Sequence, residues 1–298
     1  MSAPLTAIVL VNWNGLQDTI ECIESLYASS DHNFEIFLVD NASTISPEQT
    51  IRSKFPKVNY LASSTNLGFT GGNNFALEHI LKNHFEYVLF LNNDTIVDPH
   101  FLAPLLQAFD QNPQLNAVQP CIYYHQQPSK IWSAGGKWNQ WIGDAFTIHE
   151  LPQNKQITYP DWITGCAMMV KTSAIQQTGG FNIPFFAYYE DVELSFRLNQ
   201  SKNQLAMVPT SIIWHKVGGS VHNPNKEGNL NPMVHYWNWR NRIWVMKKYQ
   251  SPLLLLVNLI LLIPKFIFTC SYFIARARWN KLKLTCKGFL DGLRYSIN

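Results

Sequence analysis

Two stretches decide the fold: residues 5–15 read LTAIVLVNWNG, and residues 87–94 read YVLFLNND. In each, a short apolar run ends in a cluster of polar side chains. Two further apolar runs, 34–39 and 58–61, lie between them, and segments with helical spacing separate the four runs. Strands that alternate with helices predict an α/β fold, with a Rossmann-like, mostly parallel central sheet and flanking helices.

The polar clusters follow these strands along the chain. They are 12–15, Asp40, the Gly- and Asn-rich segment 66–74, and 92–94. In parallel sheets, ligands bind beyond the carboxyl ends of the strands. We therefore expect a binding site at that edge of the sheet.

The middle of the chain is less regular. Trp and Gly residues between 132 and 141 indicate loops and short antiparallel strands. We expect a buried strand at 163–170, a helix at 190–199, and two short strands at 205–208 and 212–214.

Composition excludes several classes of protein. The 298 residues carry a net charge of +3, are 46% hydrophobic and only 14% charged. This excludes intrinsic disorder and gives no basic footprint for nucleic acid, so we expect no nucleic-acid partner. A charged fraction well below the usual value of roughly 25% indicates contact with lipid or an apolar partner. The five cysteines form no CxxC pair, which predicts reduced, mostly buried thiols in a cytoplasmic protein.

The C-terminal region has a different composition. Residues 253–263 and 266–275 are apolar runs interrupted by Pro264 and Lys265, and basic residues flank both sides. Each half is too short to cross a bilayer alone, and the basic flanks favour the cytoplasmic side. We expect a kinked hairpin or in-plane pair inserted from that side, peripheral or monotopic at the cytoplasmic face of the inner (plasma) membrane. The alternative is a buried helical pair that packs on the globular part or on a dimer partner.

These patterns divide the chain into a globular domain, 1–232, and a helical, membrane-associated region, 233–298. At the N-terminus, Pro4 leads directly into a strand-like run without a basic segment and an apolar core before it. We therefore expect the bulk of the protein not to be exported.

Several strand-end residues have both a structural and a chemical reading. Asp40 suits a nucleotide ribose or base, or a turn cap. Segment 66–74 suits a phosphate at a helix N-terminus, or merely a tight loop. It is not GxGxxG, which disfavours a nicotinamide or flavin enzyme. Asp94 and His215 are candidate ligands of a divalent metal, and each has a plain structural alternative.

The run Glu190-Asp191-Val192-Glu193 opens the expected helix. Carboxylates in a first turn are kept ionised by the helix dipole, so they serve either as caps or as a general base. Because Glu193 and Arg197 are spaced i,i+4, we interpret Glu193 as structural.

Taken in order, these motifs resemble the family 2 inverting glycosyltransferases with the GT-A fold, particularly bacterial rhamnosyltransferase-like members. The resemblance covers roughly residues 5 to 220. The matching motifs are 11–15, 39–43, 66–74, 91–95, 164–166, Glu190-Asp191 and His215.

The resemblance implies a role for each residue. Asp191 would be the catalytic base. Mg²⁺ or Mn²⁺ would be the cofactor, held by Asp94, the last acid of a D-x-D motif, and by His215. The first acid of that motif is Asn92 here, so one negative charge is missing. The nucleotide-sugar site would comprise Asn12, Asn14, Asp40, Asn66, Gly68, Asn92 and Asn93, and the acceptor side Thr164, Gly165, Cys166 and Glu190.

The implied function is transfer of a sugar from a nucleotide-sugar donor to a glycan acceptor. The resemblance favours L-rhamnose from dTDP-rhamnose and a lipid-linked acceptor, in cell-surface polysaccharide assembly. One alternative is a polyprenyl-phosphate or protein glycosyltransferase of the same fold. The other is a catalytically silent nucleotide-sugar-binding membrane protein, which the missing acid at position 92 would suit.

Overall fold

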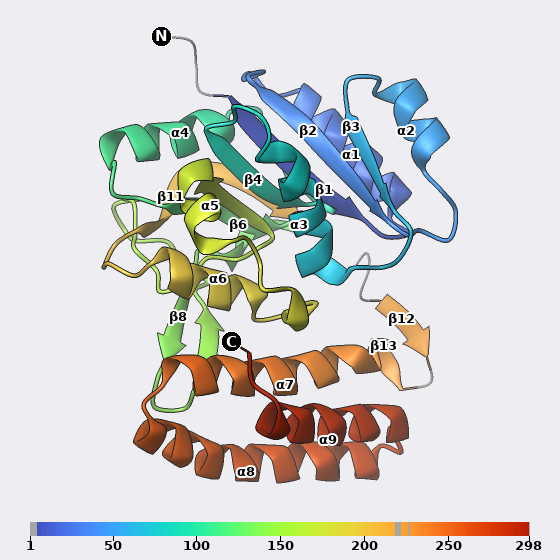
Figure 1. Ribbon diagram of the computed structural model, residues 1–298, viewed down its shortest axis with the longest axis vertical. Helices are drawn as coiled ribbons and strands as arrows, with labels where there is room; N and C mark the ends of the chain where they lie inside the picture. The colour runs from blue at the N-terminus through green and yellow to red at the C-terminus, as the bar shows by residue number, and fades with distance from the viewer. Residues whose placement is uncertain (1–4, 218–221, 226, 298) are drawn as a thin grey trace.

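The structure is a computed structural model that describes residues 5–217, 222–225 and 227–297, so Pro4 lies outside it. Its centre is a nine-stranded sheet in the order β3-β2-β1-β4-β10-β6-β11-β5, with β7 paired to β6 (Figure 1). The strands of this sheet are β1 (Thr6–Asn12), β2 (Phe34–Asn41), β3 (Asn59–Ser63), β4 (Tyr87–Asn92), β5 (Thr95–Val97), β6 (Ala117–Tyr124), β7 (Gln127–Ser133), β10 (Ala167–Lys171) and β11 (Leu205–His215). The predicted α/β fold with a mostly parallel sheet is confirmed.

The first four strands are parallel, as the alternation of strands and helices predicts. Strand β1 is buried on both faces: Ile8 and Leu10 join one core, and Ala7 and Val9 join the other. The two cores need helices on both faces of the sheet. Helices α1 (Leu16–Tyr27), α2 (Glu48–Lys54) and α4 (Leu102–Gln111) cover one face, and α3 (Gly68–Ile80), α5 (Thr172–Thr178) and α6 (Glu190–Leu198) cover the other.

The second half of the sheet differs from the prediction in two places. Residues 205–208 and 212–214 belong to one strand, β11, because a bulge between Val208 and Ile212 keeps it paired to β6 across the break. The strand expected at 163–170 begins only at Ala167, since residues 164–166 turn beside the end of β4. Two antiparallel hairpins, β8 (Gly136–Asn139) with β9 (Asp144–Thr147) and β12 (His222–Asn225) with β13 (Gly228–Leu230), complete the strands.

The Gly-rich segment 66–74 lies mainly inside a helix. A tight loop was one reading of this segment, but α3 begins at Gly68. Gly72 explains why glycine is used inside a helix: a Cβ there would come within 2.9 Å of the Val11 side chain on β1. The glycines thus let α3 approach the sheet closely.

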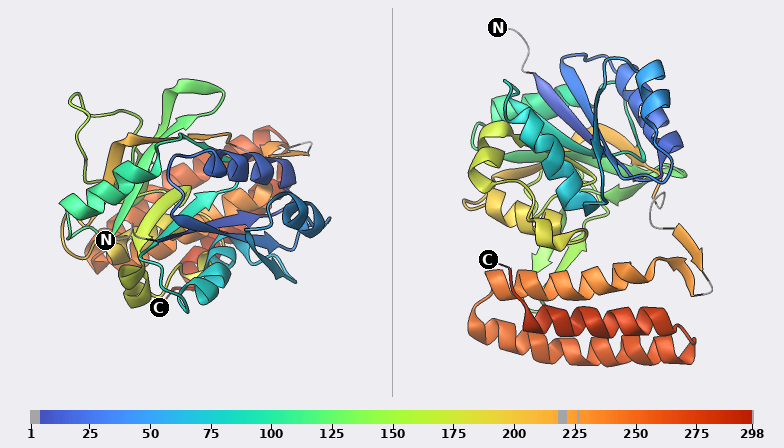
Figure 2. Two further views of the ribbon diagram at one scale, coloured as in Figure 1. Left: turned by 90° about the horizontal axis from the view of Figure 1, so that it is seen from above. Right: turned by 45° about the vertical axis from the view of Figure 1, so that its right-hand side comes forward.

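Three C-terminal helices form a layer at the end of the molecule remote from the N-terminus (Figure 2). They are α7 (Pro232–Tyr249), α8 (Pro252–Ala275) and α9 (Trp279–Arg294). Helix α7 packs extensively on α9 and also contacts the globular part, because Arg242 pairs with Asp144 of β9. The division of the chain into two regions between residues 232 and 233 stays a prediction. Helix α7 begins at this boundary and contacts both the globular part and α9.

The predicted break at Pro264 is wrong. Helix α8 runs continuously from Pro252 to Ala275 with Pro264 inside it. A proline removes one backbone hydrogen bond and disfavours the helix locally. Here buried contacts on both sides of it, from Leu262 and Phe273, hold the helix against its neighbours.

Candidate active site

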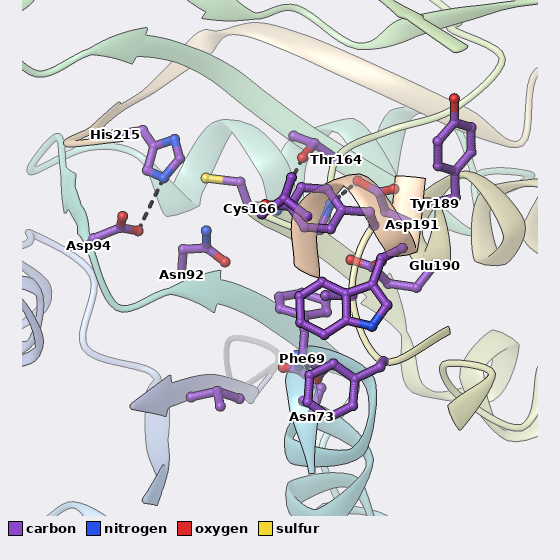
Figure 3. Close-up of a pocket in the computed structure, with 18 of the residues that line it drawn as sticks. Phe69, Asn73, Asn92, Asp94, Thr164, Cys166, Tyr189, Glu190, Asp191 and His215 are labelled. Atoms are coloured by element: carbon purple, nitrogen blue, oxygen red, sulfur yellow. Dashed lines mark hydrogen bonds and ion pairs between the residues drawn. The ribbon is translucent and has the colours of Figure 1, made fainter. Parts of the chain in front are cut away.

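A cavity of about 870 Å³ opens at the carboxyl ends of β1 and β4, where the sequence predicts a site. Figure 3 shows Asn92, Asp94 and His215 on one side of it, and Glu190 and Asp191 on the other. We call the strand-end side the polar wall, formed by Asn41, Asn66, Asn92, Asn93, Asp94 and His215. The site residues predicted from β4, from 164–166 and from the start of α6 are therefore brought together.

Asp94 and His215 meet on the polar wall. Antiparallel pairing of β11 with β5 places the imidazole Nε2 3.1 Å from the Asp94 Oδ1. Burial alone would lower the pKa of His215, but the neighbouring Cys166 and Asp94 side chains raise it to about 10. The pair presents one carboxylate and one imidazole, both buried, at the edge of the cavity.

These donors fit a divalent ion only in part. Within the described residues, no group of three His, Cys, Asp or Glu side chains is arranged to hold a metal. Mg²⁺ and Mn²⁺ often take one or two protein ligands and complete their shell with substrate phosphates and water. Asp94 and His215 therefore suit such a shared site, in which a diphosphate supplies further oxygens.

Asp191 lies at the start of α6, across from the Asp94–His215 pair. Its Oδ2 accepts a hydrogen bond of 3.1 Å from the Gly165 amide, and its Oδ1 accepts one of 2.9 Å from the Val192 amide. A side chain at position 165 would collide with the ring of Phe69, 2.9 Å from its Cβ, so this close approach needs glycine. Burial raises the pKa of Asp191, while the two amides oppose the rise.

Thr164, Gly165 and Cys166 form the turn before β10 and line the cavity between its two sides. The Cys166 amide donates to the Thr164 Oγ1 at 3.2 Å, which fixes the turn. Burial raises the pKa of the Cys166 thiol. Cys22, Cys121 and Cys166 are buried and Cys270 and Cys286 are half-buried; all five lie in described ranges and are free thiols, as the sequence predicts.

Glu190 is buried next to Asp191 and lines the same cavity. Its Oε2 finds no hydrogen-bond partner among the residues that the structure describes. Burial, reinforced by the charge of Asp191, raises the pKa of Glu190 well above its ordinary value. The two adjacent carboxyl groups therefore differ: Asp191 is held by two amides, and Glu190 favours its neutral form.

The asparagines of the polar wall fix the loop that leads into α3. The Asn41 amide donates to the Asn66 Oδ1 at 3.2 Å and to the Gly68 carbonyl at 3.0 Å. Asn93 donates to the Thr19 Oγ1 at 2.8 Å, which ties the end of β4 to α1. Asn66, Gly68, Asn92 and Asn93 all reach the cavity.

The helix N-terminus at Gly68 is not a phosphate cradle. The amides of Phe69 and Thr70, which would face a phosphate, donate instead to the carbonyl of Phe186, at 2.8 and 3.2 Å. Gly68 has φ +71°, and a Cβ there would lie 2.6 Å from Phe186. Glycine therefore does permit a close approach at this position, as expected. The group that approaches is Phe186 of the protein itself.

Asn12, Asn14 and Asp40 lie behind the cavity rather than on its lining. Parallel pairing places Asn12 beside Asp40, and the Asn12 amide donates to Ser43 Oγ at 3.0 Å. Asn14 accepts from the Thr44 amide at 2.7 Å, and Asp40 accepts from the Ser43 amide at 3.2 Å. These side chains shape the loops around the site, and their predicted contacts with a nucleotide stay predictions.

The sequence analysis missed a group of aromatic residues in the cavity. Phe186, Tyr188 and Trp237 line it, and we call them the aromatic wall. The run 185–189 was visible before Glu190, but nothing local connects it to Trp237 on α7. Three tryptophans, at 237, 239 and 244, are the sequence signal that marks α7.

Glu193, by contrast, is structural, as its spacing from Arg197 predicts. It is fully buried and its carboxylate accepts both Nε and Nη2 hydrogen bonds from Arg197, at 2.8–3.0 Å. Lys248 and Tyr249 of α7 also donate to it, at 3.2 and 3.0 Å.

Comparison with known proteins identifies relatives of this fold and site. The sequence profile described as "Glycosyl transferase family 2" matches residues 7–177. An N-acetylglucosaminyl-diphospho-decaprenol L-rhamnosyltransferase of Mycobacterium tuberculosis is 26% identical over 227 residues, which are 68% of this chain and 73% of the relative. Rhamnosyltransferase WbbL of Escherichia coli is 24% identical over 68% of this chain and 80% of its own length.

Solved structures show the same fold at low sequence identity. GalNAc-T7 with UDP, GalNAc and Mn²⁺ superimposes with a TM-score of 0.62 and 16% identity, over 74% of this chain and 45% of that chain. The mannosyltransferase PcManGT from Pyrobaculum calidifontis, with GDP-Man and Mn²⁺, has a TM-score of 0.59 and 13% identity, over 98% of this chain and 88% of that chain. The predicted GT-A fold is confirmed by these likenesses.

Proposed function

Because the chain belongs to glycosyl transferase family 2, we propose that it moves L-rhamnose from dTDP-rhamnose onto a lipid-linked glycan, in cell-surface polysaccharide assembly, with inversion at the anomeric carbon. That it is a glycosyltransferase follows from the family. Support for the donor sugar and for the lipid-linked acceptor comes from the printed names of the two rhamnosyltransferase relatives.

One observation carries the proposal: a single cavity holds Asp191 on one side and the Asp94–His215 pair on the other. We propose that the donor diphosphate lies against the polar wall, with Asn66, Gly68, Asn92 and Asn93 around the sugar nucleotide. The acceptor hydroxyl would approach from the side of Asp191, next to Thr164, Gly165, Cys166 and Glu190. Attack from the face opposite the leaving group inverts the anomeric carbon.

Asp191 suits the role of general base. In this role its carboxylate takes the proton of the acceptor hydroxyl as that oxygen bonds to the anomeric carbon. The hydrogen bonds that it accepts from two backbone amides hold the carboxylate in one orientation. Since burial raises its pKa, it is a stronger base than an exposed aspartate.

Asp94 and His215 would hold a divalent ion, Mg²⁺ or Mn²⁺. Two of the solved relatives contain Mn²⁺, and the Asp94 carboxylate and the His215 imidazole, once the ion displaces its proton, offer the oxygen and nitrogen donors that suit it. When bound, such an ion supplies positive charge that stabilises a leaving diphosphate. Asn92 provides only a neutral amide at the position of the missing acid.

The test is nucleotide release by the purified full-length protein in mild detergent. It is offered a panel of nucleotide-sugars that includes dTDP-rhamnose, with N-acetylglucosaminyl-diphospho-decaprenol as acceptor and with Mg²⁺, Mn²⁺ or a chelator. We expect metal-dependent release from one donor, and a loss of about 10²-fold or more in Asp191→Asn. Asp110→Asn, at an exposed position, is the matched control.

Each other outcome contradicts a defined part of the proposal. Release that survives in Asp191→Asn excludes this residue as the base. Release from a donor other than dTDP-rhamnose corrects the sugar. Binding of nucleotide without any release, with or without metal, favours the silent binder that the neutral Asn92 would suit.

We also propose that α8 anchors the enzyme in the plane of the membrane, at its cytoplasmic face. Among the described residues, α8 is the one helix long and apolar enough to cross a bilayer. It lies along α7 and α9 in both views, and its inner side is tied to the β8–β9 hairpin through Asn258 and Lys265 (Figures 1 and 2). A spanning α8 would carry the charged residues of α7 and α9 into the bilayer with it.

The outer side of α8 is an apolar surface that no other part of the described chain covers. Leu253 and Phe268, near its two ends, are 74% and 75% exposed. Vesicle flotation with anionic lipids checks this contact. Leu256→Glu combined with Ile260→Glu should release the protein from vesicles, because charge on this face opposes insertion. Ile45→Glu, at a still more exposed apolar position on the globular part, should not; release by both or by neither contradicts the anchor.

A further inference from the structure

The aromatic wall is a built surface inside the cavity. The rings of Phe186 and Trp237 stack with centroids 4.9 Å apart and planes 20° apart. The ring of Tyr188 lies 6.3 Å from that of Trp237, at 25°. Three nearly parallel rings from two distant segments therefore line one region of a site whose other side is polar.

The backbone beneath these rings is strained. Phe186, Tyr188 and Tyr189 have φ values of +66°, +68° and +65°, a region that residues with a side chain avoid. Such conformations are costly and persist only where the surroundings enforce them, and such strain gathers at functional sites. The strained segment immediately precedes Glu190 and Asp191.

Two neighbouring elements hold the segment in this conformation. On α7, the buried Asn241 amide donates to the carbonyls of Phe185, Ala187 and Tyr188 at 3.0, 2.8 and 2.7 Å. On α3, the two N-terminal amides described above bind the carbonyl of Phe186. Hydrogen bonds from α7 and α3 therefore hold the segment in the conformation that presents these rings to the cavity.

Chemistry limits what these rings can bind. Aromatic side chains are rigid, apolar on their faces, and lose little conformational entropy on binding. A pyranose ring matches them because one of its faces carries C–H groups while its hydroxyls point outward. Asn238 on α7 also reaches the cavity and offers an amide to such hydroxyls.

We propose that the aromatic wall is the subsite for the acceptor, and that Phe186, Tyr188 and Trp237 pack against the C–H face of the sugar that receives the transferred residue. The proposal rests on the proposed glycosyl transfer. The wall lies on the segment that carries Asp191, whereas the strand-end residues occupy the other side, so the acceptor hydroxyl is delivered to the base. Helix α7 also lies alongside α8 in the C-terminal helical layer (Figure 1), which is the proposed membrane side, from which a lipid-linked glycan would arrive.

Steady-state kinetics of Trp237→Leu test the subsite. Leucine keeps apolar volume but removes the ring. With N-acetylglucosaminyl-diphospho-decaprenol as acceptor, we expect the acceptor KM to rise about tenfold, equivalent to roughly 1.4 kcal/mol. The donor KM and the slow release of nucleotide to water should stay within twofold. Trp237→Phe should recover most of the loss, and Trp141→Leu, an exposed tryptophan of the β8–β9 hairpin, should change nothing.

Other results overturn the subsite. An unchanged acceptor KM, or a rise in donor KM of the same size, removes the aromatic wall from the acceptor side. If wild-type protein turns over no donor, the proposed function fails by itself. The subsite is then judged by equilibrium binding of the same lipid-linked sugar, and equal binding by wild type and Trp237→Leu contradicts it. Thermal melting of each variant separates lost binding from lost folding.

Discussion

The two sides of the cavity are held in different ways. The polar wall rests on several separate hydrogen bonds that tie strand ends to the helices beside them, as in Asn41 with Gly68 or Asn93 with Thr19. In the segment behind the aromatic wall, one side chain, Asn241, contacts three carbonyls at once. Damage to one polar-wall bond leaves the others in place, whereas damage to Asn241 releases a strained segment.

This difference places a point of control behind the residues that line the cavity. Asn241 is fully buried on α7 and does not line the cavity, yet it fixes the backbone two residues before Glu190. A change there should reach Asp191 through the segment and leave the polar wall intact. Helix α7 is thus as much a part of the catalytic unit as the strands are.

Of the substitutions that test this comparison, replacing Asn241 should have the largest effect on stability and activity. Asn241→Ala removes the side-chain donor to the Ala187 and Tyr188 carbonyls and one of the donors to the Phe185 carbonyl, and it should lower the free energy of unfolding by about 1–3 kcal/mol. Because the base shifts while the donor side is unchanged, kcat should fall about tenfold or more with little change in donor KM. Chemical denaturation and steady-state kinetics measure the two effects.

Two further variants test whether the effect comes from the hydrogen bonds that Asn241 donates. Asn241→Asp puts a carboxylate against the same carbonyls, so it should be worse than alanine in both measurements. Asn83→Ala removes an amide that donates to one carbonyl in an exposed turn, and should change neither. A rise in donor KM in Asn241→Ala, with kcat preserved, would show that Asn241 supports the polar wall and not the aromatic wall.

The polar wall could be predicted from sequence because its residues follow a local rule. Apolar runs mark strands, parallel strands end at one edge, and pairing aligns Val11 with Asn92 there. His215 was found in the same way, from its position after an apolar run. The motif order then supplied the roles.

The aromatic wall could not be predicted because it depends on non-local contacts. Positive φ at Phe186 and Tyr188 is invisible in side-chain patterns, and Trp237 joins them only through the packing of α7. The same limit explains the error at Pro264, where packing against neighbours keeps α8 continuous despite the proline. The close approach at Gly68 is also non-local, because its partner there is Phe186.

The smallest expected effect concerns Glu190, which lies between the two walls. Its pKa is raised above the unfolded value of about 4.3, because burial and the charge of Asp191 disfavour ionisation. The folded state therefore binds a proton that the unfolded state releases, and this lowers stability as pH rises from the unfolded pKa towards the folded one. Below that window, the carboxyl is protonated in both states and costs nothing.

Glu190→Gln mimics the neutral carboxyl and removes this dependence. Thermal melts from pH 4 to pH 8 should show the variant gaining stability relative to wild type as pH rises, with the two proteins closest at pH 4. A control at Glu78, an exposed glutamate of α3, should give a constant difference across the range. If wild type becomes the more stable protein at high pH, Glu190 is ionised in the folded state, and a cation or hydrogen-bond donor must face it across the cavity.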